Sequence, residues 1–228
     1  MNENPEKGLY LQLERRGFTP SHVAEVGVYM PETSNIFDYI EAGIRTTLVE
    51  PDPDSITRIR ERFDGYDNIT LHTVAAYDFE GKLDLSQRDA STFVSELEES
   101  PAIVNDGYVV TDEDRFSVAC TTFDTLDDGT IDLLSIDTEG SEWFVIKYLT
   151  SRPTVISVET HGAAYVNPHL DKIEAWMSEN GYGLLYKEKC DSVYTRLDKL
   201  PPGLGDKLAL LFRNAQLGLR RFRKRLFR

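Results

Sequence analysis

The sequence predicts an α/β fold, with a mostly parallel β-sheet covered by helices on both faces. Two observations predict it. Short apolar runs alternate with helix-like stretches along the chain, and several of these runs are apolar almost throughout. Such runs are typical of parallel strands that are buried on both faces. With 228 residues, of which 40% are hydrophobic and 28% charged, the chain has the size and composition of one globular domain.

The elements are expected in alternating order. The expected strands are 22–28, 46–50, 69–76, 131–137, 154–160 and 183–188, and the expected helices are 33–42, 54–63, 141–149 and 168–180. Asp52 can cap a helix that begins at Pro53, and Ser141 with Glu142 can begin another. The last stretch, GLLYKEKCDSVYTRL, contains no helical interlude. We therefore expect an antiparallel pair that closes the sheet.

Residues 81–120 interrupt this alternation. GKLDLSQRD and RFSVACTTF are expected to be strands, and they flank an irregular acidic stretch within residues 86–114. A loop of that length inside a domain is usually a functional lid or a disordered insert. We expect this insert to determine which acceptor a catalytic site would take.

Charge and composition exclude several classes of protein. The chain carries a net charge of −14, and residues 213–228 hold seven Arg or Lys and no acid, which leaves a net −21 on the remainder. The strongly acidic remainder of the chain is expected to repel nucleic acid. No apolar run is long enough to span a bilayer, and the polar N-terminus does not resemble a signal peptide. With two distant cysteines outside any metal-type spacing, we expect a cytoplasmic protein with reduced thiols.

The turn in VAEVGVYMPETSN, residues 23–35, suggests a ligand without phosphate. Gly27 permits a tight turn after the first strand, where doubly wound folds bind their ligands. Pro31 has no N–H group and Glu32 is negatively charged, and both features oppose a pyrophosphate. S-adenosylmethionine (SAM), which has an adenosine, a positive centre and no phosphate, fits better. The alternative is a simple turn glycine.

Acids at the ends of the next two strands are candidates to bind the ribose and the adenine of such a cofactor. Glu50 ends the second strand, 23 residues after Gly27, where an acid typically binds ribose hydroxyls. Asp78 follows the third strand and is a candidate for the adenine amino group. The alternative for Glu50 is an exposed acid before a helix, and the alternative for Asp78 is an ordinary turn residue.

Acids also gather after the strand in IDLLSIDTEGSEW. Asp137, Glu139 and Glu142 follow it directly, and buried acids need a partner such as a cation. The alternative interpretation is a helix N-terminus that is enriched in acids, which accounts well for Glu142 but less well for Asp137.

The next strand, in TVISVETHG, ends in Glu159 and His161. Sequential strands are usually neighbours, so both residues are expected near Asp137. His161 is a candidate general base, with Asp137 and Glu159 as catalytic partners. The same three residues are also a candidate divalent-metal site, although no close-spaced ligand pair supports it, and His161 as an ordinary surface histidine is the alternative.

The chain resembles the FkbM-type family of SAM-dependent methyltransferases over roughly residues 20–190. The stretches that carry the resemblance are AEVGVYMPETSN, TLVEPDP, TVAAYDFEGKLDL, VACTTFDTL, IDLLSIDTEGSEWFVIKYL and ISVETHG. It implies a class I SAM-methyltransferase (Rossmann-like) fold with a seven-stranded sheet whose last strand is antiparallel. It also implies methyl transfer to a hydroxyl oxygen, on a sugar or glycan or on a secondary metabolite.

The resemblance also implies roles for individual residues. Glu25 and Gly27 belong to the first cofactor motif, Glu50 to the ribose, Asp78 to the adenine side, and Asp137 to the cleft beside the methyl group. The sequence departs from the family where a proline, residue 31, replaces a frequent second glycine. The methyltransferase domain is expected over residues 1–200.

Residues 201–228 are expected to form a basic amphipathic helix. Its apolar residues recur at spacings of three and four: Leu204, Leu208, Leu211, Ala215, Leu219, Phe222 and Leu226. Such a helix suits an anionic membrane surface, its own acidic body or a second subunit in a homodimer. An alternative to the enzyme is therefore a catalytically inactive SAM-fold scaffold that binds membranes through this tail.

Overall fold

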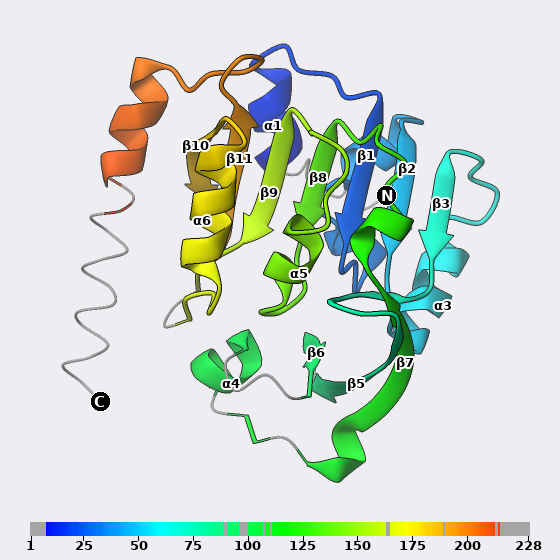
Figure 1. The fold of residues 1–228 in the computed structure, drawn as a ribbon. Coiled ribbons are helices and arrows are strands. Elements are labelled where there is room, and N and C mark those ends of the chain that lie inside the picture. The colour runs from blue at the N-terminus through cyan, green and yellow to red at the C-terminus, as the bar shows by residue number, and fades with distance from the viewer. Residues whose placement is uncertain are drawn as a thin grey trace.

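The computed structural model describes residues 8–88, 91–95, 100–106, 108–109, 111–162, 165–188, 190–212 and 214. Its main sheet has seven strands in the spatial order β10-β11-β9-β8-β1-β2-β3 (Figure 1). The strands are β1 (His22–Val26), β2 (Arg45–Val49), β3 (Ile69–His72), β8 (Leu133–Ile136), β9 (Val155–Glu159), β10 (Tyr182–Glu188) and β11 (Asp191–Arg196).

The first strand lies in the middle of the sheet and pairs in parallel with β2 and β8. Val23 is in register with Thr46 on one side and with Leu133 on the other. β11 runs antiparallel to both of its neighbours, β9 and β10. The expected parallel sheet, the closing antiparallel pair and the antiparallel last strand are confirmed. This is the strand order and direction of the class I SAM-methyltransferase fold.

Helices cover both faces of the main sheet. They are α1 (Gly8–Glu14), α2 (Phe37–Glu41), α3 (Pro53–Arg62), α5 (Glu142–Ile146) and α6 (Leu170–Glu179). Figure 1 shows α5 and α6 in front of the sheet, where Val145, Ile173 and Met177 pack on strand residues. Leu13 and Ile59 belong to a second core cluster, formed with α1, α2 and α3. These two apolar layers account for the continuous hydrophobicity of the strands.

The start of α3 agrees with its expected cap. Asp52 accepts a hydrogen bond from the Ser55 backbone N–H at 2.8 Å, and Pro53 is the first helical residue. A side-chain acceptor at this position satisfies a backbone donor that the helix itself cannot.

Two expected elements are divided in the structure. The expected helix at 33–42 is a short 3-10 turn, η1 (Pro31–Thr33), followed by α2. The Asn35 and Ile36 amides between them donate to side chains, those of Glu25 and Ser34, so these amides do not continue a helix. The expected strand at 69–76 is β3 followed by the two-residue β4 (Ala75–Ala76), because β4 pairs with a different sheet.

That second sheet has four strands in the order β4-β7-β5-β6. Its longer strands are β5 (Gly81–Arg88), β6 (Ser91–Val94) and β7 (Arg115–Thr121), accompanied by α4 (Pro101–Asp106), η2 (Asp112–Asp114) and η3 (Phe123–Thr125). The two strands expected to flank the insert are confirmed, and the described part of the insert adds a strand and a helix. Figure 1 shows this sheet beyond the carboxyl ends of the parallel strands. It therefore faces the edge at which doubly wound folds bind ligands.

Residues 204–212 and 214 of the expected C-terminal helix are helical, and the basic residues from 215 onward lie outside the described part. Among the described residues, no helix is both long and apolar enough to cross a membrane.

Candidate functional site

A cavity of about 320 Å³ lies between the carboxyl edge of the main sheet and the second sheet. The main sheet contributes Glu25, Gly27, Glu50, Asp137 and Glu159 to its lining, all of which were predicted from the sequence as site residues. The volume is in the range of small-molecule and cofactor sites. The structure thus brings five of the seven predicted residues to one cavity.

Gly27 ends the first strand in a backbone conformation that favours glycine, with φ at 82°. A Cβ atom at this position would lie 1.8 Å from the Asp137 carbonyl oxygen. That oxygen belongs to the neighbouring strand end, where the Asp137 N–H donates to the Val26 carbonyl at 2.9 Å. Only glycine lets the two strand ends approach this closely.

Glu50 fixes the turn that follows Gly27. Its Oε2 accepts hydrogen bonds from the backbone N–H groups of Val28, at 2.8 Å, and Tyr29, at 3.0 Å. Its Oε1 accepts one from the Asp52 N–H at 2.8 Å. Burial raises the pKa of Glu50, and the three backbone donors oppose that shift. Since Oε1 accepts a single bond, it can take another from a ligand hydroxyl.

These contacts make the turn a poor phosphate site. The N–H groups of Val28 and Tyr29 donate to Glu50, and Pro31 has none. A pyrophosphate requires free backbone donors here, so these contacts, like Pro31 and Glu32 in the sequence, oppose a dinucleotide.

Glu25 is buried within the first strand, with 2% of its surface exposed. Its Oε1 accepts a hydrogen bond from the Asn35 N–H at 2.9 Å. Its Oε2 has no hydrogen-bond partner within the described part of the chain. Burial raises the pKa of Glu25 to about 7. An unpaired buried oxygen at a cavity wall is suited to a cationic ligand group.

The turn from Asp137 to Glu142 is held by the Glu142 side chain. Oε1 of Glu142 accepts from the Thr138 and Gly140 N–H groups, both at 3.0 Å, and Oε2 accepts from the Asn167 side-chain amide. Glu139, which lies between Thr138 and Gly140, has a φ of 55°, and such a value is unusual for a residue other than glycine. Burial raises the pKa of Asp137 to about 6 and that of Glu142 to about 7.

Glu159 ends β9 beside this turn and is 7% exposed. Burial, followed by the charges of Asp137, Glu142 and Glu139, holds the pKa of Glu159 well above its usual range. Four acids therefore lie together, and three of them line the cavity.

The two remaining predicted residues do not line the cavity. His161 is 1% exposed, and its Nδ1 lies 2.9 Å from the Thr160 hydroxyl. Asp78 forms an ion pair with Lys147 and accepts a hydrogen bond from the Tyr148 hydroxyl at 3.0 Å. The hydrogen bond from Lys147 lowers the pKa of Asp78. The general-base role of His161 and the adenine role of Asp78 stay predictions.

The second sheet supplies an apolar wall that we did not predict from the sequence. Leu83, Leu85, Phe93 and Val94 line the same cavity as the acids. In GKLDLSQR the leucines alternate with polar residues, which is the sequence signal for one buried face.

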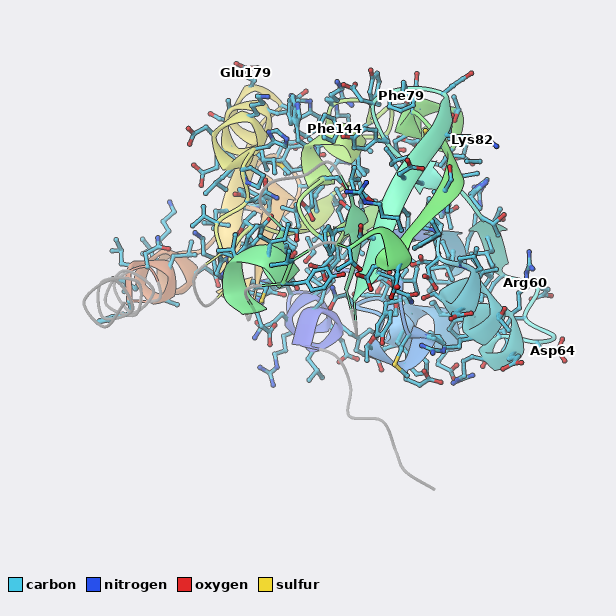
Figure 2. All side chains as sticks on the ribbon, turned by 90° about the horizontal axis from the view of Figure 1, so that it is seen from below. Arg60, Asp64, Phe79, Lys82, Phe144 and Glu179 are labelled. Carbon is cyan, nitrogen blue, oxygen red and sulfur yellow. The ribbon has the colours of Figure 1, made fainter. Side chains whose placement is uncertain are left out.

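Tyr77 extends this wall to an aromatic group at the surface. It lines the cavity, and its ring packs 5.7 Å from that of Phe79 and 4.5 Å from that of Phe144. Figure 2, seen from the side of the strand ends, labels both phenylalanines. Phe79 is 45% exposed, so the aromatic group reaches solvent.

Comparison with known proteins agrees with this architecture. A solved structure, the methyltransferase FkbM from Methylobacillus flagellatus KT, superposes with a TM-score of 0.50 at 16% identity over 77% of this chain. The match spans 43% of that protein, so this chain corresponds to less than half of its length. A SAM-dependent methyltransferase from Aquifex aeolicus aligns over 83% of this chain and 89% of its own, with 10% identity and a TM-score of 0.41. At such identities the first similarity shows the fold alone, and the second adds no argument.

No curated protein matches the sequence. The family described as "Methyltransferase FkbM domain" matches residues 22–184, which include Glu25, Gly27, Glu50, Asp137 and Glu159. The chain therefore belongs to the FkbM family of SAM-dependent methyltransferases.

Proposed function

We propose that this chain transfers a methyl group from SAM to a hydroxyl oxygen of a small molecule, either a sugar or glycan or a secondary metabolite. The observation that carries the proposal is the cavity in which Glu25, Glu50 and Asp137 converge on the Gly27 turn. Bound SAM would supply an electrophilic methyl group on a positively charged sulfur.

The lining residues fit that cofactor. Glu50 keeps acceptor capacity at Oε1 for a ribose hydroxyl, and Glu25 presents an unpaired oxygen to a cationic group of the methionine part. Asp137 lines the same cavity after the neighbouring strand, where its carboxylate would favour the positively charged sulfur of the cofactor. The donors that a pyrophosphate would need are occupied by Glu50.

The acceptor would lie between the acids and the second sheet. Leu83, Leu85 and Phe93 offer apolar surface to its ring or chain. Asp137 and Glu159 would be the groups that remove the hydroxyl proton, because burial raises the pKa of both carboxyl groups above its usual range. Most of the rate enhancement would come from holding the reacting atoms in line. His161 would act on the acceptor only if its ring reached the cavity.

Methyl transfer from radiolabelled SAM to a panel of sugars, glycans and phenols tests the proposal, with the matching amines as a parallel panel. We expect labelled ethers from at least one hydroxyl acceptor, and loss of labelling in Glu159→Gln. Glu179→Gln, on the exposed surface of α6 (Figure 2), is the matched control and retains activity. Labelling confined to the amines would contradict O-methylation.

A second candidate function is binding to an anionic membrane surface through the C-terminal segment. Leu204, Leu208, Leu211 and Phe212 are between 58% and 82% exposed on the helical residues 204–212. The sequence that follows is strongly basic. Co-sedimentation with vesicles containing phosphatidylserine tests this function. Binding that is lost without the anionic lipid supports it, and a monodisperse dimer with no vesicle binding favours subunit contact instead.

A further inference from the structure

Three carboxylates from three different elements meet at the edge of the cavity. Asp137 follows β8, Glu142 begins α5 and Glu159 ends β9. One oxygen from each lies within 4.8 Å of an oxygen of the other two. Parallel strands that end at the same edge bring such residues together from distant parts of the sequence.

No basic side chain neutralises this group within the described part of the chain. The ion pairs found there join other acids, among them Asp78, Asp128 and Asp198. Burial and then the charges of Asp137, Glu142 and Glu139 raise the pKa of Glu159. Such a concentration of acids, with Glu142 and Glu159 buried and Asp137 half-buried, is unfavourable unless a cation or protons balance it.

Glu159 provides an independent indication of a ligand. The residue is more than nine-tenths buried, yet its Oε2 accepts no hydrogen bond from any described residue. Glu142, in contrast, is held by two backbone N–H groups and by Asn167, which fix its position. A carboxylate offers about four lone-pair positions, so three donors leave room for a further contact.

We propose that Asp137, Glu142 and Glu159 bind a hard divalent cation, Mg²⁺ or Mn²⁺. Such ions prefer oxygen ligands, particularly carboxylates. Around Mg²⁺, neighbouring oxygens are about 3 Å apart and opposite ones about 4 Å. The three side chains, whose oxygens lie within 4.8 Å of one another, would therefore close by roughly 1–2 Å on binding the ion. Three protein ligands leave the other positions open to water and to an acceptor oxygen.

The structure changes the ligand set that the sequence suggested. His161 was expected to complete a site with Asp137 and Glu159, but it is not part of the group whose ligand atoms lie together. Its Nδ1 lies against the Thr160 hydroxyl instead. Glu142, which the sequence suggested both as one of three acids that could bind a cation and as an acidic helix start, is the third member of the group instead.

The role of this cation rests on the proposed methyl transfer to a hydroxyl. A bound divalent cation lowers the pKa of a hydroxyl that coordinates it. The O–H bond of the acceptor breaks, the proton leaves to water, and the oxygen keeps the electron pair. With the cation bound, Asp137 and Glu159 hold the metal and do not take the proton themselves. The apolar wall of the second sheet then selects the shape of the acceptor.

Binding of Mn²⁺ to the full chain, freed of metal with EDTA, provides the test. The electron paramagnetic resonance signal of free Mn²⁺ falls as the ion binds. We expect one site per chain with a Kd below about 1 mM, and competition by Mg²⁺. Glu159→Gln and Asp137→Asn weaken binding at least tenfold, whereas the surface variant Glu179→Gln binds as the wild type does. If circular dichroism shows that Glu159→Gln does not fold, Mn²⁺ binding by Asp137→Asn decides the test.

A parallel titration with S-adenosylhomocysteine separates this inference from the proposed function. Binding of S-adenosylhomocysteine without any Mn²⁺ site overturns the metal proposal and leaves methyl transfer intact. A Mn²⁺ site without cofactor binding supports the cation site and contradicts the proposed function. Equal Mn²⁺ binding by wild type and both acid variants places the ion elsewhere and overturns the proposal.

Discussion

The Gly27 backbone lies against the Asp137 carbonyl oxygen so closely that a Cβ at residue 27 would be 1.8 Å from that oxygen. Two strand ends of the candidate site, far apart in the sequence, thus meet at a contact that leaves no room for a side chain at residue 27. The cofactor turn and the acidic turn are therefore not independent. A side chain added at residue 27 is expected to displace the Asp137 strand end.

Gly27→Ala should lower the free energy of unfolding by about 2–4 kcal/mol, from strain at positive φ together with the clash. Gly65→Ala is the matched control. Its φ is similar, 80°, but no atom lies within 4 Å of the added Cβ. It should therefore cost only about 1–2 kcal/mol. Urea denaturation of both variants gives the comparison, and equal losses would contradict the close contact as the cause.

Glu50→Gln should weaken binding of S-adenosylhomocysteine by about 10- to 100-fold. Glutamine keeps only one acceptor oxygen, so its NH₂ group faces either the Asp52 N–H or the N–H groups of Val28 and Tyr29, and that side of the turn loses its hydrogen bonding. Calorimetry measures the affinity, with the surface variant Glu179→Gln as the control. An unchanged affinity in Glu50→Gln would remove Glu50 from the cofactor site.

Glu25 should make the stability of the ligand-free protein depend on pH. Burial raises its pKa from 4.5 to about 7, so the folded state binds a proton that the unfolded state releases. The stability that this group contributes is present below about pH 4.5 and is lost as the pH rises toward 7. Relative to wild type, Glu25→Gln should gain about 2–3 kcal/mol between pH 5 and 8. Denaturation midpoints across this range measure it, and a constant difference would contradict the raised pKa.

Asn167→Ala should destabilise the fold by about 1–3 kcal/mol, because it leaves the buried Oε2 of Glu142 without its side-chain donor. A double-mutant cycle with Glu142→Gln isolates the interaction. We expect a coupling energy above about 0.5 kcal/mol from chemical denaturation. Additive effects would show that the contact contributes nothing of its own.

The site residues that lie at the ends of consecutive strands were predictable from the sequence. Glu50 could be placed because an acid about 20 residues after a glycine turn lies at the end of the next strand. Asp137 and Glu159 could be brought together because sequential strands are usually neighbours. The resemblance to the FkbM family supplied the antiparallel last strand. Local signals such as Asp52 before Pro53 also predicted the start of α3.

Contacts between distant segments were not predictable in the same way. Nothing in the sequence around Asn167 indicates that it donates to Glu142. The ion pair of Asp78 with Lys147 likewise depends on how α5 packs, which no local pattern contains. The expected helix at 33–42 is interrupted because Glu25 accepts a hydrogen bond from the Asn35 amide, so a tertiary contact prevails over helical propensity.

Calorimetric titration of the purified chain with S-adenosylhomocysteine and, separately, with NAD⁺ tests the central claim most directly. The cavity formed by the Gly27 turn, Glu25 and Glu50 predicts micromolar binding of S-adenosylhomocysteine at one site per chain and no binding of NAD⁺. Failure to bind S-adenosylhomocysteine at millimolar concentration, or comparable binding of NAD⁺, would contradict the account.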